Sequence, residues 1–243
     1  MLEVIEVARK NRIEQVRITV RQATMEDLES LLEIDAVVWS GFPASEEMIR
    51  SRLKVFPQGQ FVALCDDRVI GSVYSQLVDY KSLPESFTWA EATDNGTIQR
   101  THKPKGRSVY GVGLAVLPEF QGTSASQLLI VSLAKFAVFS CRYRVLWGAR
   151  IPSYHKHAQM SVEEYIKKRT KSGRPVDPEL ALYWPYGAEP IRPLPNYMPD
   201  SDSLNCGVLV VATWKSWIVR GIERILTKSR LKLRRCRRAC YVG

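Results

Sequence analysis

The segment from Val109 to Phe139 constrains the fold of this chain more than any other part of the sequence. Residues 109–116 have the pattern of a buried strand, and residues 127–139 form a strongly apolar helical pattern. Between them, residues 121–126 (QGTSAS) are small apart from the first. Small residues let a ligand approach the backbone, and the first N–H groups of a helix have no internal partner. The segment therefore predicts a phosphate-binding turn or an ordinary strand-to-helix connection.

The rest of the sequence predicts a mixed sheet around this segment. Alternation and apolar runs predict strands at 16–21, 60–65, 69–78, 144–149 and 207–214. Helical spacing predicts helices at 28–39, 46–55 and 162–171. Residues 79–107 and the Pro-rich residues 173–200 have irregular patterns, and residues 1–15 form a charged lead-in. This order predicts an α/β fold (an α+β sandwich) with helices on both faces of the sheet.

The loop at 121–126 lacks the sequence of two common phosphate-binding motifs. No Gly-Lys-Ser/Thr follows it, as a Walker loop requires, and it lacks the glycine spacing of a dinucleotide fingerprint. Thr123 or Ser124 has the side chain of a helix cap, which is the structural alternative to a ligand-binding role.

The strand, the turn Pro118-Glu119-Phe120-Gln121-Gly122 and the helix together resemble the acyl-CoA-binding motif of the GNAT acyltransferase superfamily. Its pattern is Gln/Arg-x-x-Gly-x-Gly/Ala, and its backbone amides hold the coenzyme A pyrophosphate. Gln121 and Gly122 match this pattern, whereas Ser124 and Ser126 stand at later positions that favour glycine. Serine stays small but restricts the backbone more than glycine does. The resemblance implies a GNAT fold with a mixed, mostly antiparallel sheet over residues 16–214.

A second set of segments resembles a narrower group within this superfamily. Trp39 is followed by residues 45–53 (SEEMIRSRL), 148–155 (GARIPSYH) and 160–165 (MSVEEY), and then by residues 195–200 (PNYMPD). They resemble the GNAT-like loading domains of bacterial polyketide synthases and the GNAT domains fused to nitrilase-type amidases. The loading-domain resemblance implies that malonyl-CoA is decarboxylated and that acetyl passes to the thiol of an acyl carrier protein.

The resemblance also implies a set of cofactor-binding residues. Acyl transfer needs a polarised thioester carbonyl, and GNAT proteins bind this oxygen with backbone N–H groups where two strands splay apart. Those positions here are Leu114, Ala115 and Val116. The pyrophosphate would lie against Gln121, Gly122, Thr123, Ser124, Ala125 and Ser126.

The first candidates for the catalytic side chains are His155, Thr123 and Trp39. His155 follows the predicted strand 144–149 and corresponds to a catalytic histidine of the loading domains, and His157 is the choice if the match is offset by two residues. Thr123 is the candidate hydroxyl, with helix capping as its alternative. Trp39 is a candidate wall of the acyl pocket or a core tryptophan. Arg169 could hold a malonyl carboxylate, although a solvated helix face is the favoured interpretation.

Two other functions remain open at this point. One is a CoA-dependent N-acetyltransferase that acts on a small-molecule or protein amine, for which Glu119 is the carboxylate nearest in sequence to the predicted acyl site. The other is a non-catalytic GNAT-like module that binds acyl-CoA or a partner. Either acetyl-CoA or malonyl-CoA is the expected donor. With three histidines and five irregularly spaced cysteines, we expect no metal site and read the cysteines as reduced thiols.

The positive charge of the chain is concentrated at one end. Of the formal net charge of +10, residues 215–243 contribute +9, with ten Lys/Arg against Glu223. Their helical spacing predicts a basic amphipathic tail, which would fit a membrane surface, an acidic carrier protein or simple docking with a solvated end. No recognition motif points to specific nucleic-acid binding. The N-terminus lacks the apolar region of a signal peptide, which predicts a cytoplasmic location.

Overall fold

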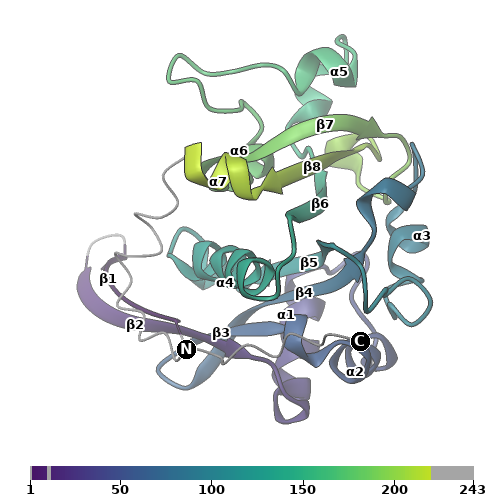
Figure 1. The fold of residues 1–243 in the computed structure, drawn as a ribbon. Helices are drawn as coiled ribbons and strands as arrows, with labels where there is room; N and C mark the ends of the chain where they lie inside the picture. The colour runs from purple at the N-terminus through teal and green to yellow at the C-terminus, as the bar shows by residue number, and fades with distance from the viewer. Residues whose placement is uncertain (1, 10–11, 220–243) are drawn as a thin grey trace.

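The computed structural model describes residues 2–9 and 12–219, which build one eight-stranded sheet. Across the sheet the strands follow the order β1-β2-β3-β4-β5-β6-β8-β7 (Figure 1). Their bounds are β1 (Leu2–Arg9), β2 (Arg12–Gln22), β3 (Phe61–Cys65), β4 (Arg68–Val78), β5 (Ser108–Val116), β6 (Arg144–Arg150), β7 (Ala188–Leu194) and β8 (Gly207–Thr213). Among these described strands, every pairing is antiparallel except β5 with β6. The predicted mixed, mostly antiparallel sheet is confirmed.

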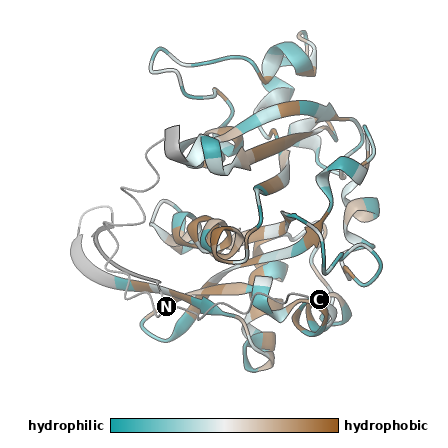
Figure 2. Ribbon diagram, viewed as in Figure 1, coloured by the Kyte–Doolittle hydropathy of each residue, from teal (hydrophilic) through white to brown (hydrophobic). Residues whose placement is uncertain are grey.

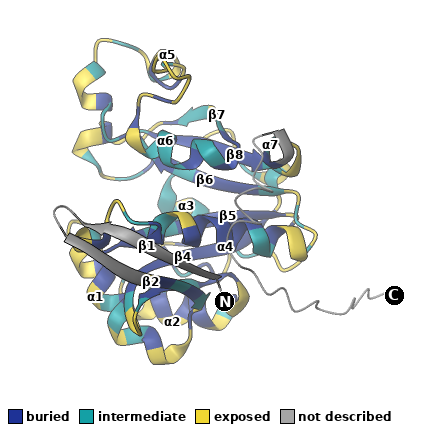
Figure 3. Ribbon diagram, turned by 90° about the vertical axis from the view of Figure 1, so that its left-hand side faces the viewer, coloured by how far each residue is buried: buried dark blue, intermediate teal, exposed yellow. Residues whose placement is uncertain are grey.

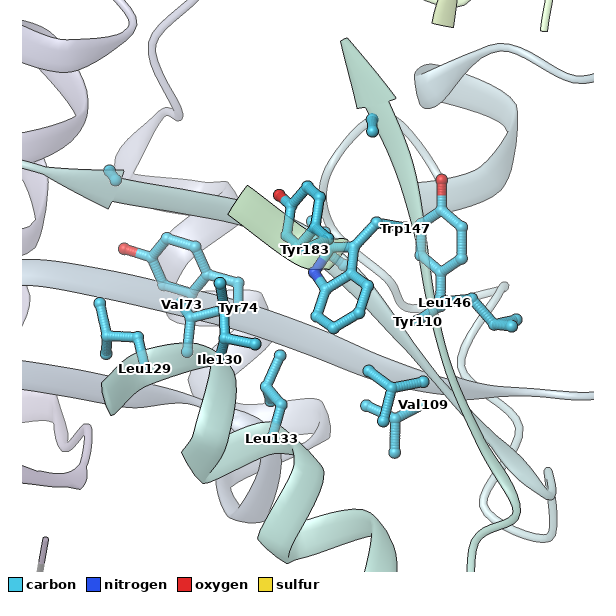
Figure 4. Close-up of a cluster of buried hydrophobic side chains, with 14 of the residues drawn as sticks. Val73, Tyr74, Val109, Tyr110, Leu129, Ile130, Leu133, Leu146, Trp147 and Tyr183 are labelled. Atoms are coloured by element: carbon cyan, nitrogen blue, oxygen red, sulfur yellow. The ribbon is translucent and has the colours of Figure 1, made fainter. Parts of the chain in front are cut away.

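Helices cover both faces of this sheet, as predicted. They are α1 (Leu28–Val38), α2 (Glu46–Val55), α3 (Trp89–Thr93), α4 (Ala125–Phe139), α5 (Val162–Tyr165), α6 (Pro178–Tyr183) and α7 (Trp214–Val219). Helix α4 packs across β2 to β6, and α1 packs against β4 and β5. Successive residues of a strand face opposite sides. Val73 of β4 accordingly lies beside α4 in Figure 4, whereas the neighbouring Tyr74 donates a hydrogen bond to Asp35 of α1.

The apolar residues of α4 and the central strands form the core. Leu129, Ile130 and Leu133 of α4 are fully buried against the sheet, together with Val109 and Leu146 (Figure 4). Each such side chain contributes about 2 kcal/mol when it leaves water. Hydrophobic colouring concentrates on these strands and on α4 in Figure 2, and the same elements are buried in Figure 3. The core therefore fixes β5, β6 and the start of α4 relative to one another.

The N-terminus differs from the sequence prediction. Residues 1–15 were expected to be a charged lead-in, but β1 pairs with β2 in a register that joins Leu2 to Val20 and Val7 to Gln15. Strand β1 is the outer strand of the sheet, and edge strands of native proteins commonly carry charged residues. Charge alone was therefore a poor reason to exclude a strand.

The Pro-rich segment 173–200 was expected to be irregular, and this was wrong. It contains α6 and β7, and β7 includes Pro190 and Pro193. Among the described strands, β7 pairs with β8 alone and forms the other edge of the sheet, the place where proline is tolerated within sheets. The excursion 79–107 likewise contains a short helix, α3.

The predicted helix at 162–171 ends early. Helix α5 stops at Tyr165, and the chain then turns back so that Val176 N–H bonds to Lys168 O. After Ile166 the sequence is Lys167-Lys168-Arg169, which offers no apolar face to bury and places like charges together. Arg169 consequently lies after the helix and not on it.

The C-terminal tail is described only at its start. Helix α7 begins directly after β8, at Trp214, in agreement with the predicted change from strand to helix. The remainder of the basic amphipathic tail, residues 220–243, lies outside the described residues. Within residues 2–9 and 12–219, none of the helices combines the length and the apolar character that crossing a bilayer requires.

Candidate active site

The parallel strands β5 and β6 separate halfway along their length. They pair from Ser108 with Arg144 to Gly111 with Trp147, and the pairing stops there. Strand β5 continues to Val116 along β4, and β6 continues to Arg150 along β8. The splay expected between these strands is therefore present. Beyond Gly111, no strand of the described residues lies beside the edge of β5 that faces β6.

A cavity of about 350 Å³ lies at this opening. Its wall combines the opened halves of β5 and β6 with the end of α1, the start of α2, helix α6 and the segment before β8. Most of its lining is apolar, and its large aromatic members are Trp39, Phe42, Tyr74, Trp89, Trp147, Tyr183 and Tyr197. Such a wall excludes water, which strengthens any electrostatic interaction made inside the cavity.

Trp147 marks the point where the strands part. Its ring stacks on Tyr183 at 4.7 Å between centroids, and both side chains are buried (Figure 4). A Cβ built on Gly111 would lie 2.1 Å from Trp147 Nε1, so this nitrogen sits directly over the glycine. Within the described chain, the Nε1–H has no hydrogen-bond partner. A buried donor left unpaired costs free energy, which an oxygen atom of a ligand would recover.

One end of the cavity carries a charged cluster around Arg150. The Arg150 Nε atom lies 3.3 Å from Asp200 Oδ2 and 3.7 Å from Glu179 Oε2. The Arg150 guanidinium also packs over the Trp39 ring at 5.4 Å. The backbone N–H of Arg150 donates a hydrogen bond to Glu179 Oε1 at 3.1 Å. Burial raises the pKa of Glu179 to about 7, because desolvation outweighs the attraction of Arg150.

A second polar cluster lies on the opposite wall, around Arg52. This side chain is only 2% exposed, donates from Nε to Gly96 O at 2.7 Å, and packs over the Tyr74 ring at 4.6 Å. Tyr74 O–H reaches Asp35 Oδ2 at 3.3 Å. Burial raises the pKa of Asp35 above its ordinary value, and the positive charge of Arg52 opposes the rise.

The structure separates the predicted cofactor-binding residues into two places. Leu114 and Ala115 line the cavity, whereas Val116 is buried at the end of β5 without lining it. Residues 121–124 form the turn that leads into α4, and Ala125 and Ser126 are the first two residues of that helix. Gly122 in this turn has φ +83° with open space where a Cβ would be, and Gln121 is exposed beside it. Ser124 and Ala125 are buried, and Ser126 is half-buried.

The left-handed backbone of Gly122 predicts a cost for any side chain at this position. Gly122→Ala should lower the free energy of unfolding by about 1 kcal/mol, since an L-residue is strained at positive φ even without a clash. Thermal unfolding should show a melting temperature lower by about 2–4 °C. The matched control is Gly41→Ala, which meets nothing within 4 Å and has no positive φ. Equal melting temperatures for the two variants would contradict this prediction.

Of the predicted catalytic residues, only Trp39 lines the cavity. Thr123 Oγ1 donates to Phe120 O at 2.6 Å and accepts from Ala125 N–H at 3.3 Å, which are local contacts at the helix start. His155 lies on the short 3₁₀ helix η5 (Tyr154–His157), is 37% exposed, and contacts Pro152 O and Asp202 O through Nδ1. A catalytic role for Thr123 or His155 stays a prediction.

The remaining candidates also lie outside the cavity. The His157 ring packs against Tyr165 at 5.2 Å. Arg169 Nη1 donates to Ile166 O, and its Nη2 lies 3.9 Å from Glu189. Glu119 is exposed and pairs with Arg68 at 3.2 Å. The carboxyl groups that line the cavity are instead Asp35 and Glu179.

Sequence reasoning missed both charged clusters of the cavity. Arg150 belongs to the segment GARIPSYH, but its partner Glu179 lies in the Pro-rich segment that was read as irregular. The signal was present as Asp177-Pro178-Glu179, since Asp177 is the N-cap and Pro178 the first residue of α6. No group of His, Cys, Asp and Glu suited to a metal ion occurs in the part of the chain that the structure describes.

Comparisons with known proteins agree with this fold. No protein-family model matches the sequence. The chain is 35% identical over 205 residues to the uncharacterized N-acetyltransferase YkwB of Bacillus subtilis (strain 168), covering 82% of this chain and 89% of that protein. The loading GNATL domain of CurA from Lyngbya majuscula is similar in structure (TM-score 0.72, 30% identity, 81% of this chain and 97% of that chain). The GphF GNAT-like decarboxylase, solved with isobutyryl-CoA, superposes with a TM-score of 0.65 at 24% identity, over 80% of this chain and 98% of that chain.

The fold and the splayed strands define an acyltransferase of the GNAT type, and the prediction of an acyl-CoA-dependent enzyme is confirmed at this level. The chain belongs to the GNAT acyltransferase superfamily. The resemblance to GNAT-like loading domains, which rested on Trp39 and the segments after it, is likewise confirmed.

Proposed function

We propose that this enzyme decarboxylates malonyl-CoA and transfers the resulting acetyl group to the phosphopantetheine thiol of an acyl carrier protein. The observation that carries the proposal is the apolar cavity at the opening between β5 and β6, with a buried, unpaired Trp147 N–H at its apex in the described structure. Support also comes from the similar structures, one of which is a loading domain and another a GNAT-like decarboxylase.

The donor would run along the opened side of β5. The N-terminus of α4, with its approach at residues 121–126, would hold the pyrophosphate through backbone N–H groups. The thioester would then lie beside Leu114, and the acyl group would enter the cavity next to Trp39. This arrangement needs little net positive charge, because backbone amides supply the anion-binding groups.

The cavity suits a decarboxylation for a physical reason. Loss of CO₂ from malonyl-CoA leaves an enolate, and donors directed at its oxygen lower the barrier. Trp147 Nε1–H is one such donor, and backbone N–H groups of β5 beyond Gly111, where the pairing with β6 ends, would supply the others. The aromatic wall replaces water around the carboxylate that is lost, and Arg52 and Arg150 face the same space.

The test is incubation of the full chain with malonyl-CoA or acetyl-CoA, with and without a phosphopantetheinylated carrier protein, followed by mass spectrometry. We expect acetyl-carrier from malonyl-CoA and an activity loss of at least about tenfold in Trp39→Ala, because the acyl pocket loses its wall. Trp214→Ala is the matched control, since Trp214 is an exposed tryptophan at the start of α7. Carrier protein that stays unacylated with both donors would refute the proposal.

One observation favours a second function. The carboxyl groups of Asp35 and Glu179 both line the cavity, and either could accept a proton from an ammonium group during amine acetylation. The relative YkwB is named an N-acetyltransferase. Acetylation of polyamines or peptide amines from acetyl-CoA, with no reaction of malonyl-CoA, would select this alternative.

A further inference from the structure

We propose that Glu179 is the general acid that protonates the enolate carbon after decarboxylation, a role that rests on the proposed function above. Glu179 lines the cavity from α6, facing the opened halves of β5 and β6. None of the three histidines of the sequence lines this cavity. A proton donor to the acyl group has to reach the cavity interior, which is lined by the carboxyl groups of Glu179 and Asp35 and by Tyr74, Tyr183 and Tyr197. Burial raises the pKa of all three tyrosines, so the carboxyl groups are the acids that can give up and regain a proton near neutral pH.

Local structure holds the Glu179 carboxyl group in position. Asp177 caps α6 by accepting from Glu179 N–H at 3.0 Å and Leu180 N–H at 3.3 Å. Asp177 is itself fixed by Tyr165 O–H and Ser153 N–H. Glu179 Oε1 accepts a hydrogen bond from the backbone N–H of Arg150. The other carboxyl oxygen, Oε2, is therefore the one that can carry the proton.

The charges around Glu179 explain why it can be protonated near neutral pH. Burial is the largest effect and raises its pKa to about 7, and the nearby charges of Asp177 and Asp200 act in the same direction. Arg150 opposes them but is shared with Asp200. Five charged or titratable groups face Glu179. They are Arg150 of β6, Asp177 at the N-cap of α6, Tyr183 of α6, and Tyr197 and Asp200 in the segment before β8.

Asp35 is less suited to the same role. Its carboxylate accepts the Tyr74 hydroxyl and lies beside the buried guanidinium of Arg52, which stabilises the ionised form. The environments of the two carboxyl groups therefore differ. Asp35 has Arg52 beside it, whereas Glu179 shares Arg150 with Asp200. Burial raises the pKa of both groups, and at Asp35 the charge of Arg52 opposes that rise.

The reaction balances with solvent as the proton source. Malonyl-CoA loses its carboxylate as CO₂, and the electron pair of the broken C–C bond forms the enolate of the thioester. The protonated Glu179 gives its proton to the α-carbon, which yields acetyl-CoA and the Glu179 carboxylate. The carboxylate then takes a proton from water, so that malonyl-CoA and one proton become acetyl-CoA and CO₂.

The experiment measures acetyl-CoA formed from malonyl-CoA across pH 5.5–8.5, without carrier protein, in the full chain. An acid must be protonated to act, so the wild-type rate should fall tenfold per pH unit above about 7. Glu179→Gln should lower the rate about 100-fold or more and remove this dependence, while binding of acetyl-CoA by calorimetry is retained. Glu179→Asp should recover part of the rate together with the pH dependence.

The control is Glu163→Gln, an exposed glutamate on α5, which should behave as wild type. If the decarboxylation rate of Glu179→Gln still fell above about pH 7 as in wild type, the assignment would be overturned. It would also be overturned if Glu179→Gln lost acetyl-CoA binding as much as decarboxylation, because that result indicates a structural role. Wild-type protein that transfers acetyl from acetyl-CoA but leaves malonyl-CoA intact at every pH would overturn the decarboxylase function itself. That outcome differs from a failure of Glu179 alone, in which wild-type decarboxylation persists.

Discussion

Replacing Gly111 by alanine should destabilise the protein by about 2–3 kcal/mol, the range expected for overpacking a close-packed core. A Cβ at this position would lie 2.1 Å from Trp147 Nε1 and 2.2 Å from Cδ1, far inside contact distance. The Trp147 ring is buried and stacked on Tyr183, so a shift of the ring to make room would cost this stacking contact. Thermal unfolding should show a melting temperature lower by about 4–12 °C.

Gly113→Ala is the matched control for this change. It lies two residues along the same strand, and the nearest atom to its added Cβ would be 3.9 Å away, an ordinary contact. We expect its melting temperature to stay within about 2 °C of wild type. If Gly113→Ala were as damaging as Gly111→Ala, the cause would be a general sensitivity of β5 and not the position of Trp147.

Arg52→Met should have a larger effect, a loss of about 3–5 kcal/mol of stability, because it leaves a buried carboxylate without its cation. Arg52 and Asp35 are 2% and 4% exposed, and the substitution also removes the hydrogen bond to Gly96 O. Chemical denaturation followed by tryptophan fluorescence would measure the loss at several pH values.

The pH dependence of this variant has a definite sign. The pKa of Asp35 is already raised in the folded state, so the native state binds more protons than the unfolded state above the ordinary carboxyl range. Removing Arg52 raises that pKa further, so the stability deficit should grow as pH rises and shrink towards acid pH. In Asp35→Asn/Arg52→Met the ionisable group is absent, and the deficit should become independent of pH. A deficit of Arg52→Met that is constant with pH would contradict the electrostatic explanation.

The sequence predicts those elements whose periodicity is local. Helix α2 has the predicted bounds Glu46–Val55, since Ser45 caps it and a hydrophobic face follows at regular spacing. Strand β7 was missed because Pro190 and Pro193 argue against a strand unless its place at the sheet edge is known. Edge position is a property of the whole sheet, which no local pattern encodes.

The residues of the candidate site also fall into those that the sequence predicts and those that only the fold brings together. Trp39 and Leu114 were found from motifs, and both line the cavity. Glu179 and Arg150 meet only because α6 packs on β6, and Asp35 meets Tyr74 across 39 positions of sequence. The protonation behaviour of these carboxyl groups comes from burial and neighbouring charges, which exist only after the chain has folded.

The prolines of β7 also limit how this protein can associate. Proline has no N–H to offer, and within sheets it occurs where that group would otherwise point to solvent. A strand from another molecule that approached the free side of β7 would find carbonyl groups without the matching donors at Pro190 and Pro193. A second molecule is therefore hindered from extending the sheet by strand pairing at this edge.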